Sequence, residues 1–457
     1  MGGRRCARTA SRAAMTAALA TAAVLAGSWT GTYSLPTGTD PVDISVQLHG
    51  KSALVAFGRG HASLTSVPVV VRGAHVRFVF PGGVAFDGVL RGNAVSGTVR
   101  QAKVRGSFTV RRGASRVLPL FGLYRSAEGK VMTVNQATGF SPWLVELPTG
   151  DVHGIGPSLT VGDRLGDTVG NGSVAVDSGG LTWKGTRYAR VALRQSEVRV
   201  GVTAATLTLP PGPGPFPAVA MVHGSGPATR EEFQSFAAYV TSLGVAVLAG
   251  DKRGIGQSLG RYPGERASES TIDILARDAQ AQARYLATLP EIDPTRVGLL
   301  GDSQAGWIIA LAASREPAVR FAVSIVGPSV TVGESDLWGS LAGKGQSPPS
   351  GSRPSLLQQV RQAGPSGFDP AVYLRTLSIP VFWVFGSDDR NVPTELCIER
   401  LQALKAGHDF SWAVLPMTHT PLVLPSGLLA SLPESPGFAP TFFPAIGAWL
   451  RSRNIVR

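Results

Sequence analysis

The stretch VGLLGDSQAGWIIAL, residues 297–311, consists of an apolar run, a short polar turn around Ser303 and a second apolar run. Turns between a strand and a helix are often rich in Gly, Asp and Ser, so composition alone predicts only such a connection. The sharper interpretation is a nucleophile elbow, in which the turn lifts a serine hydroxyl from the end of a buried strand into a cleft. The residues around this turn decide between the two interpretations.

Residues 199–457 alternate apolar strands with helical stretches. The strands include AVAMVHG, VAVLAGD, RVGLLG, FAVSIVG, VFWVFG and SWAVLP, and the longest helical stretch is IDILARDAQAQARYLATLP. Continuous apolar strands between helices predict a mostly parallel α/β sheet that is covered on both faces. An insertion at 331–378, rich in Gly, Ser and Pro, is expected to form a cap over the carboxyl ends of the strands.

The first half of the chain is different in texture. Residues 28–115 contain β-branched and aromatic runs separated by Gly-containing turns, which predict a small antiparallel barrel or sandwich as an accessory domain. A second β-rich segment covers 116–198 and is not a clear repeat of the first. We therefore expect an α/β domain that is preceded by a β-rich N-terminal half.

The N-terminus and the charge balance bear on location and partners. Four arginines precede the apolar stretch AAMTAALATAAVLA, so residues 1–26 are expected to be a signal peptide and the protein to be exported. Removing these arginines leaves 39 basic and 30 acidic residues, and the net charge falls from +13 to +9. The basic residues do not form clusters with aromatics, so nucleic-acid binding is not expected. The excess of basic residues favours instead an association of the β-rich half with an anionic cell envelope. Cys397 is the only cysteine outside the signal, which excludes an intramolecular disulfide in the mature chain.

Polar motifs follow the predicted strands at their carboxyl ends, where parallel sheets bind ligands. These motifs are HGSGP (223–227), DKRGIGQSLG (251–260), GDSQAGW (301–307) and GSDDRNVP (386–393). In this order they resemble the α/β-hydrolase fold family, and most of all its bacterial esterase-like branch, over roughly residues 199–457. The resemblance implies hydrolysis of acyl compounds by a serine nucleophile.

The resemblance also implies which residues would act. Ser303 would be the nucleophile and His419, after the last strand, would be its base, because a serine hydroxyl needs an imidazole within hydrogen-bond reach. Counting from Gly386 gives Asp389 as the acid that orients the base, with Asp388 as the alternative. The order Ser, Asp, His is the order that this fold requires. The chain departs from the family pattern at Ala305, where glycine is usual, and at Thr418, where asparagine is frequent.

The oxyanion of an acyl-transfer intermediate needs preorganised N–H donors. By resemblance these are the backbone amides of Gln304 and Ser225, while His223 is expected to be structural. DKRGIGQSLG lacks the ending of a phosphate loop and is interpreted as support for the cleft, with substrate contact left open. The sequence has no metal-binding pattern and implies no cofactor.

The sequence thus predicts an exported serine hydrolase that cleaves a small-molecule carboxylic ester through an acyl-enzyme. Two alternatives stay open. One is a thioesterase or peptidase of the same fold, and the other is a non-catalytic envelope-binding protein on a degenerate hydrolase scaffold. The sequence does not give the oligomeric state.

Overall fold

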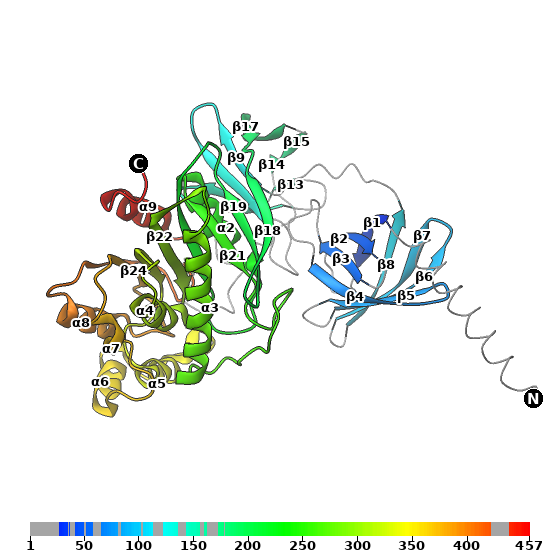
Figure 1. Ribbon diagram of the computed structural model, residues 1–457. Helices are drawn as coiled ribbons and strands as arrows, with labels where there is room; N and C mark the ends of the chain where they lie inside the picture. The colour runs from blue at the N-terminus through cyan, green and yellow to red at the C-terminus, as the bar shows by residue number, and fades with distance from the viewer. Residues whose placement is uncertain are drawn as a thin grey trace, which may run out of the picture.

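The computed structural model describes residues 27–34, 36, 42–49, 52–57, 65–80, 84–101, 104–112, 122–135, 143–155, 160–161, 172–177, 179–421 and 438–457. The predicted signal peptide at 1–26 lies outside the described residues. In Figure 1 a barrel of strands occupies one side of the picture, and a larger body of sheets and helices occupies the other. No helix in the described part of the chain is both long and apolar enough to cross a membrane.

The first unit is a closed antiparallel barrel. Its strands are β1 (Gly27–Ser34), β2 (Val42–His49), β3 (Ser52–Phe57), β4 (Thr65–Arg72), β5 (His75–Phe80), β6 (Val84–Arg91), β7 (Ala94–Gln101) and β8 (Val104–Arg112). Each strand pairs with the next, and β1 pairs with β8 in a register that places Trp29 opposite Arg112. Aromatic side chains, including Phe78, Phe86 and Phe108, fill the interior. The fold class predicted for this region is confirmed, and of its two forms the barrel is the one observed.

A seven-stranded antiparallel sheet follows the barrel. Its order is β12-β11-β10-β9-β17-β16-β15, formed by β9 (Gly122–Ser126), β10 (Val131–Asn135), β11 (Trp143–Leu147), β12 (Val152–Gly154), β15 (Ala175–Asp177), β16 (Gly180–Trp183) and β17 (Thr186–Arg190). The short strands β13 (Thr160–Val161) and β14 (Gly172–Ser173) pair separately. The Leu123 and Val145 side chains of this sheet share a core with Val219 and Tyr239 of the following domain. This second β-rich segment is therefore packed against the α/β domain through a common apolar core.

The α/β domain is built on an eight-stranded sheet of order β18-β19-β21-β20-β22-β23-β24-β25. The strands are β18 (Arg194–Val200), β19 (Thr203–Leu209), β20 (Phe216–Val222), β21 (Ala246–Gly250), β22 (Ile292–Asp302), β23 (Phe321–Ile325), β24 (Val381–Gly386) and β25 (Phe410–Leu415). The first two pairings are antiparallel and the five pairings from β21 to β25 are parallel. Every residue of β20, β21, β23 and β24 is buried, as expected for strands with both faces covered.

Helices cover both faces of this sheet, as Figure 1 shows. On one face, α2 (Gln234–Ser242) and α9 (Phe442–Ser452) contribute to the core shared with the seven-stranded sheet. On the other, α3 (Glu269–Ala287), α4 (Ala305–Arg315) and α8 (Thr394–Leu404) contribute to a second large core. A short 3-10 turn, η1 (Arg230–Phe233), precedes α2.

The segment between β23 and β24 is largely helical. It contains α5 (Val332–Ala342), η2 (Gly343–Gly345), α6 (Arg353–Ala363) and α7 (Ala371–Leu374). Trp338 of α5 and Val360 of α6 belong to the same core as α3 and α4. Two side chains of the segment reach the loop after β24: Ser335 Oγ donates to the carbonyl of Asn391 at 3.1 Å, and Arg353 Nη1 donates to that of Asp389 at 3.3 Å. The insertion is thus anchored beside one of the loops that carry candidate site residues.

Candidate active site

Ser303 occupies a tight turn between the end of β22 and the start of α4. Its φ is +55°, in the left-handed region that non-glycine residues seldom adopt. The turn is held because Ser303 N–H donates to the carbonyl of Ile325 at 2.9 Å and Gly306 N–H donates to the carbonyl of Ser303 at 2.9 Å. A strained serine at a strand-to-helix turn has the geometry of a nucleophile elbow.

Small residues allow this turn to form. A Cβ atom added to Gly301 would lie 2.3 Å from the carbonyl oxygen of Val222 and 2.6 Å from the Cβ of Ala305. The missing side chain at Gly301 therefore leaves room for the methyl group of Ala305, which is fully buried. Gly306 has the same function on the other side, because its Cβ would lie 2.7 Å from the backbone of Gly327. Ala305 is tolerated at a position where the family usually has glycine because Gly301 makes space for it.

Three side chains from three different strand ends meet at this turn. His419, which follows β25, places Nε2 2.8 Å from Ser303 Oγ. Its Nδ1 lies 2.9 Å from Oδ2 of Asp389, which follows β24. The structure thus brings together the serine, the histidine and the aspartate that the sequence analysis selected.

Two backbone N–H groups of its own loop hold the carboxylate of Asp389 in place. Its side chain is fully buried, and Oδ1 accepts the N–H groups of Asn391 at 2.7 Å and Val392 at 2.8 Å. The side chain of Asp388 is half exposed, and its Oδ1 lies 3.8 Å from Nε of Arg390. Asp389, and not its neighbour Asp388, therefore faces the histidine.

Electrostatics fixes the proton arrangement of His419. The Asp389 carboxylate can only accept, so His419 Nδ1 carries the proton and Nε2 is left to accept the Ser303 hydroxyl hydrogen. Burial by itself lowers the pKa of His419, but the charge and hydrogen bond of Asp389, together with the charge of Asp302, outweigh it and raise that pKa above its ordinary value. The arrangement prepares the ring to take a proton from Ser303 and to carry the resulting charge.

The two predicted oxyanion donors lie in loops that flank Ser303. Gly224 approaches so closely that a Cβ added to it would lie 3.1 Å from the Cβ of Ser303. Its N–H donates to Oδ1 of Asp302 at 3.1 Å, which fixes the loop that carries Ser225. Within the described residues, neither the amide of Ser225 nor that of Gln304 donates to another protein group. Both N–H groups are therefore available to an incoming ligand.

The segment that begins at Asp251 supports this loop. Asp251 is buried and forms a bidentate ion pair with Arg230, with Nε to Oδ1 at 2.9 Å and Nη2 to Oδ2 at 3.0 Å. His223 is also buried, and one of its ring nitrogens donates to the carbonyl of Gly250 at 2.7 Å. Burial lowers the pKa of His223 to about 4, so the ring stays neutral, as expected for a structural histidine. The contact between Asp251 and Arg230 has no local sequence signal, because the two residues belong to separate loops.

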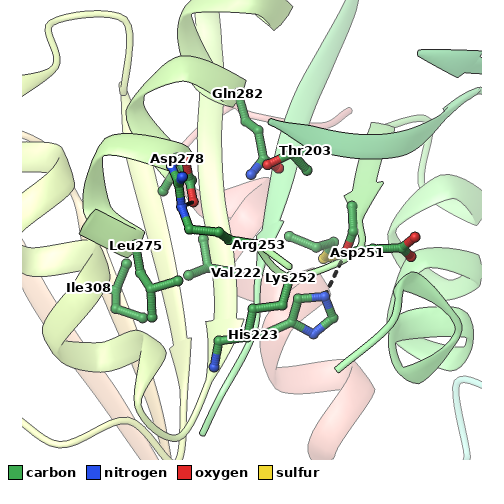
Figure 2. Close-up of a pocket in the computed structure, with 13 residues that line it drawn as sticks. Thr203, Val222, His223, Asp251, Lys252, Arg253, Leu275, Asp278, Gln282 and Ile308 are labelled. Atoms are coloured by element: carbon green, nitrogen blue, oxygen red, sulfur yellow. Dashed lines mark hydrogen bonds and ion pairs between the residues drawn. The ribbon is translucent and has the colours of Figure 1, made fainter. Parts of the chain in front are cut away.

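Lys252 is a buried residue that sequence reasoning quoted within a motif but did not assign to a function. Its ammonium group contacts the carbonyls of Gly224 and Gly226 and the side chain of Gln304. The only sequence signal was a lysine directly after an apolar strand. Figure 2 shows its side chain extending away from the Arg253–Asp278 ion pair.

Figure 2 shows a small cavity beside the ends of β20 and β21. It has a volume of about 30 Å³ and its lining includes His223, Lys252, Asp278 and Gln282, but neither Ser303 nor His419. Such a volume suits one or two water molecules. It is therefore too small to hold an acyl substrate. In the described part of the chain, no group of three or more His, Cys, Asp or Glu side chains is arranged to hold a metal ion.

Part of the chain is similar to a known protein family and to known proteins. Residues 214–348 match the family model described as serine aminopeptidase, S33. The chain is 25% identical over 213 residues to polyketide transferase claH of Penicillium crustosum, which covers 43% of this chain and 67% of that protein. It is 33% identical over 171 residues to the human mitochondrial acyl-coenzyme A thioesterase 2, which covers 36% of this chain and 32% of that protein. The chain thus spans about a third of the length of this second relative.

Solved structures are similar at lower identity. An esterase of Pyrococcus furiosus is 18% identical with a TM-score of 0.40, and the match covers 57% of this chain and 91% of that one. A dienelactone hydrolase of Anabaena variabilis is 17% identical with a TM-score of 0.36, and the match covers 58% of this chain and 99% of that one. The assignment of the fold rests on the chain itself, through the strand order, the serine turn after β22 and the matched segment. Residues 199–457 have an α/β-hydrolase fold.

Proposed function

We propose that this protein is an exported serine hydrolase that cleaves carboxylic esters through an acyl-enzyme. One observation carries the proposal: Ser303 Oγ lies 2.8 Å from His419 Nε2, while Nδ1 of the same ring lies 2.9 Å from buried Asp389. This is the arrangement in which a base can activate a serine hydroxyl and an acid can orient that base.

The reaction follows from these contacts. Ser303 Oγ attacks the acyl carbon as its proton passes to His419 Nε2, and the carbonyl oxygen becomes an oxyanion near the Ser225 and Gln304 amides. The tetrahedral intermediate collapses, the alcohol leaves with the proton from His419, and Ser303 keeps the acyl group. Water then repeats the same steps, releasing the acid and restoring the serine. Asp389 stabilises the imidazolium in both halves without itself becoming protonated.

Labelling with a fluorophosphonate probe tests the proposal directly. The wild-type protein is expected to be labelled and Ser303→Ala is not, because only an activated serine reacts with this reagent. Ser347→Ala, at an exposed serine outside the site, serves as the matched control and should be labelled like the wild type. A folded wild-type protein that is not labelled would refute the catalytic proposal and favour a non-catalytic binding protein.

A thioester substrate is the second candidate, because one relative named above is an acyl-coenzyme A thioesterase. The same residues serve either reaction, since both pass through an acyl-enzyme and an oxyanion. A panel of p-nitrophenyl esters, acyl-coenzyme A thioesters and aminoacyl p-nitroanilides would separate the ester, thioester and peptidase activities. The ester proposal expects the highest kcat/KM for the first group.

Export is a separate part of the proposal and rests on the arginine-flanked apolar stretch within residues 1–26. Expression of the full chain in a bacterial host with a secretion system should yield a processed protein whose N-terminus follows Ala26. An intact N-terminus on protein retained in the cytoplasm would contradict export without affecting the hydrolase proposal.

A further inference from the structure

Lys252 is a buried cation whose partners are carbonyl groups. It is the second residue after β21, and its exposed fraction is 5%. The Nζ atom donates to the carbonyl of Gly224 at 2.6 Å, to that of Gly226 at 3.1 Å and to Oε1 of Gln304 at 3.4 Å. An ammonium group has three N–H donors, so these three acceptors use all of them. In the described part of the chain no carboxylate forms an ion pair with it, which is unusual for a buried lysine.

The shortest of these contacts, to the carbonyl of Gly224, is made to the peptide group that carries a predicted oxyanion donor. The carbonyl of Gly224 and the N–H of Ser225 are the two ends of the same peptide unit. Because the peptide bond is delocalised, a positive charge on its oxygen draws electron density from its nitrogen and makes the N–H a stronger donor. We propose that Lys252 is a positioning residue for the oxyanion hole, and that its ammonium group polarises the Gly224–Ser225 peptide. This inference rests on the proposed function.

The remaining contacts of Lys252 hold both donors in one arrangement. The hydrogen bond to Gly226 holds the carbonyl of the residue after Ser225, as the bond to Gly224 holds that of the residue before it. The lysine therefore binds the loop on both sides of Ser225. The contact with Gln304 reaches the residue that carries the second N–H donor. Gln304 is held further by its Nε2 group, which donates to the carbonyl of Glu265 at 3.2 Å. One cation thus links the two loops whose amides would stabilise the oxyanion.

The surroundings of Lys252 set the pH range in which its ammonium group is charged and polarises the peptide. Burial lowers the pKa of Lys252 to about 8, although the charges of Asp302, Glu232 and Glu265 act in the opposite direction. The ring of Tyr262 also faces the ammonium, with its centroid 5.6 Å from Nζ. Above this pKa the neutral amine still donates hydrogen bonds but polarises the peptide less. Catalysis should therefore weaken as the pH rises through about 8.

The test compares kcat and KM of the wild type, Lys252→Met and Lys252→Arg for a p-nitrophenyl ester from about pH 6 to 10. We expect Lys252→Met to lower kcat by about 10- to 100-fold, with little change in KM, because the loss acts on the transition state. The alkaline fall of the wild-type profile should disappear in this variant. Lys252→Arg keeps the cation, because a guanidinium stays charged over this whole pH range. Its kcat should therefore stay within about tenfold of the wild type, and the alkaline fall should move beyond about pH 10. Lys130→Met, at an exposed lysine, is the matched control and should behave like the wild type.

The outcomes separate this inference from the proposed function. If the wild type does not react with a fluorophosphonate, the proposed function itself fails. If the wild type reacts and hydrolyses esters, but Lys252→Met keeps its kcat, or the alkaline fall stays unchanged in Lys252→Arg, the positioning inference is overturned while the function stands. If Lys252→Met does not fold, the pair of profiles from the wild type and Lys252→Arg still decides. A lysine that only braces the loop would lower the melting temperature in both variants without moving the alkaline limb.

Discussion

Asp389 and His419 face each other across the ends of two adjacent parallel strands, with Oδ2 of the aspartate 2.9 Å from Nδ1 of the histidine. The side chain of the neighbouring Asp388 is half exposed and lies 3.8 Å from Arg390. Two adjacent carboxylates are therefore separated by the turn after β24 into a buried one and a half-exposed one. A charge that is buried and held by two backbone N–H groups is suited to orient a base.

Replacing each aspartate separately tests this difference. Asp389→Asn should lower kcat by about 10⁴-fold, because an amide can donate to Nδ1 and so stabilise the wrong tautomer of His419. Asp388→Asn changes a half-exposed group that does not contact His419, and it should alter kcat less than about threefold. Steady-state hydrolysis of a p-nitrophenyl ester measures both. Equal losses in the two variants would contradict the assignment of the acid.

The pH dependence of the wild type should reflect the raised pKa of His419. The ring must be neutral to accept the serine proton, so kcat/KM should rise with pH through a midpoint above the ordinary value of 6.5. Because the pKa is raised in the folded state, the stabilisation by protonated His419 is present below the unfolded pKa and is lost as pH rises through the folded one. In Asp389→Asn the residual activity should show a lower midpoint, since the charge that raises the pKa is gone. A wild-type midpoint at or below 6.5 would show that burial outweighs the two carboxylates.

The packing of the serine turn makes a third prediction. Gly301→Ala should destabilise the protein by about 1–3 kcal/mol or more, because the added methyl group meets the backbone of Val222 and cannot be relieved by a side-chain rotation. Ala305→Gly restores the family pattern and should cost only about 1 kcal/mol, from the propensity of glycine in the first turn of α4. Urea unfolding measures both changes, and ester hydrolysis should persist in Ala305→Gly. Loss of activity in a stably folded Ala305→Gly would mean that the methyl group itself shapes the turn.

Several of these features follow directly from the sequence, and others do not. The alternation of apolar strands and helices in 199–457 predicts the parallel sheet, because burial on both faces demands it. Ser303 and His419 could be chosen because each follows an apolar strand in a recognisable order. The choice between Asp388 and Asp389 depends on the conformation of a single turn. Counting residues along the sequence does not predict that conformation.

Long-range contacts account for what the sequence could not give. Lys252 appears as an ordinary polar residue in a glycine-rich loop, and its burial depends on Gly224, Gly226 and Gln304 from other loops. The pairing of β1 with β8 that closes the barrel involves strands at opposite ends of the unit, so the sequence pattern left a barrel and a sandwich open. The seven-stranded sheet shares a core with α2 and α9, a relationship without a local pattern.

The barrel offers a last prediction, because its interior is a separate apolar core. Phe86 is fully buried there, stacked on Phe78 with ring centroids 4.8 Å apart and in edge contact with Phe108 at 5.2 Å. In the described residues this core contains only strands β1 to β8, whereas the serine turn and its supports belong to other cores. Phe86→Ala should therefore destabilise the barrel by about 3–5 kcal/mol while leaving ester hydrolysis within about twofold of the wild type. Val79→Ala, at an exposed position on the adjacent strand, is the control and should change stability by less than about 0.5 kcal/mol.

Limited proteolysis under increasing urea would measure unfolding of the barrel, and the ester hydrolysis of the same samples would measure the integrity of the site. If hydrolysis were lost at the same urea concentration as the barrel of Phe86→Ala, the two units would unfold as one, and the barrel would have to be counted as part of the support of the active site.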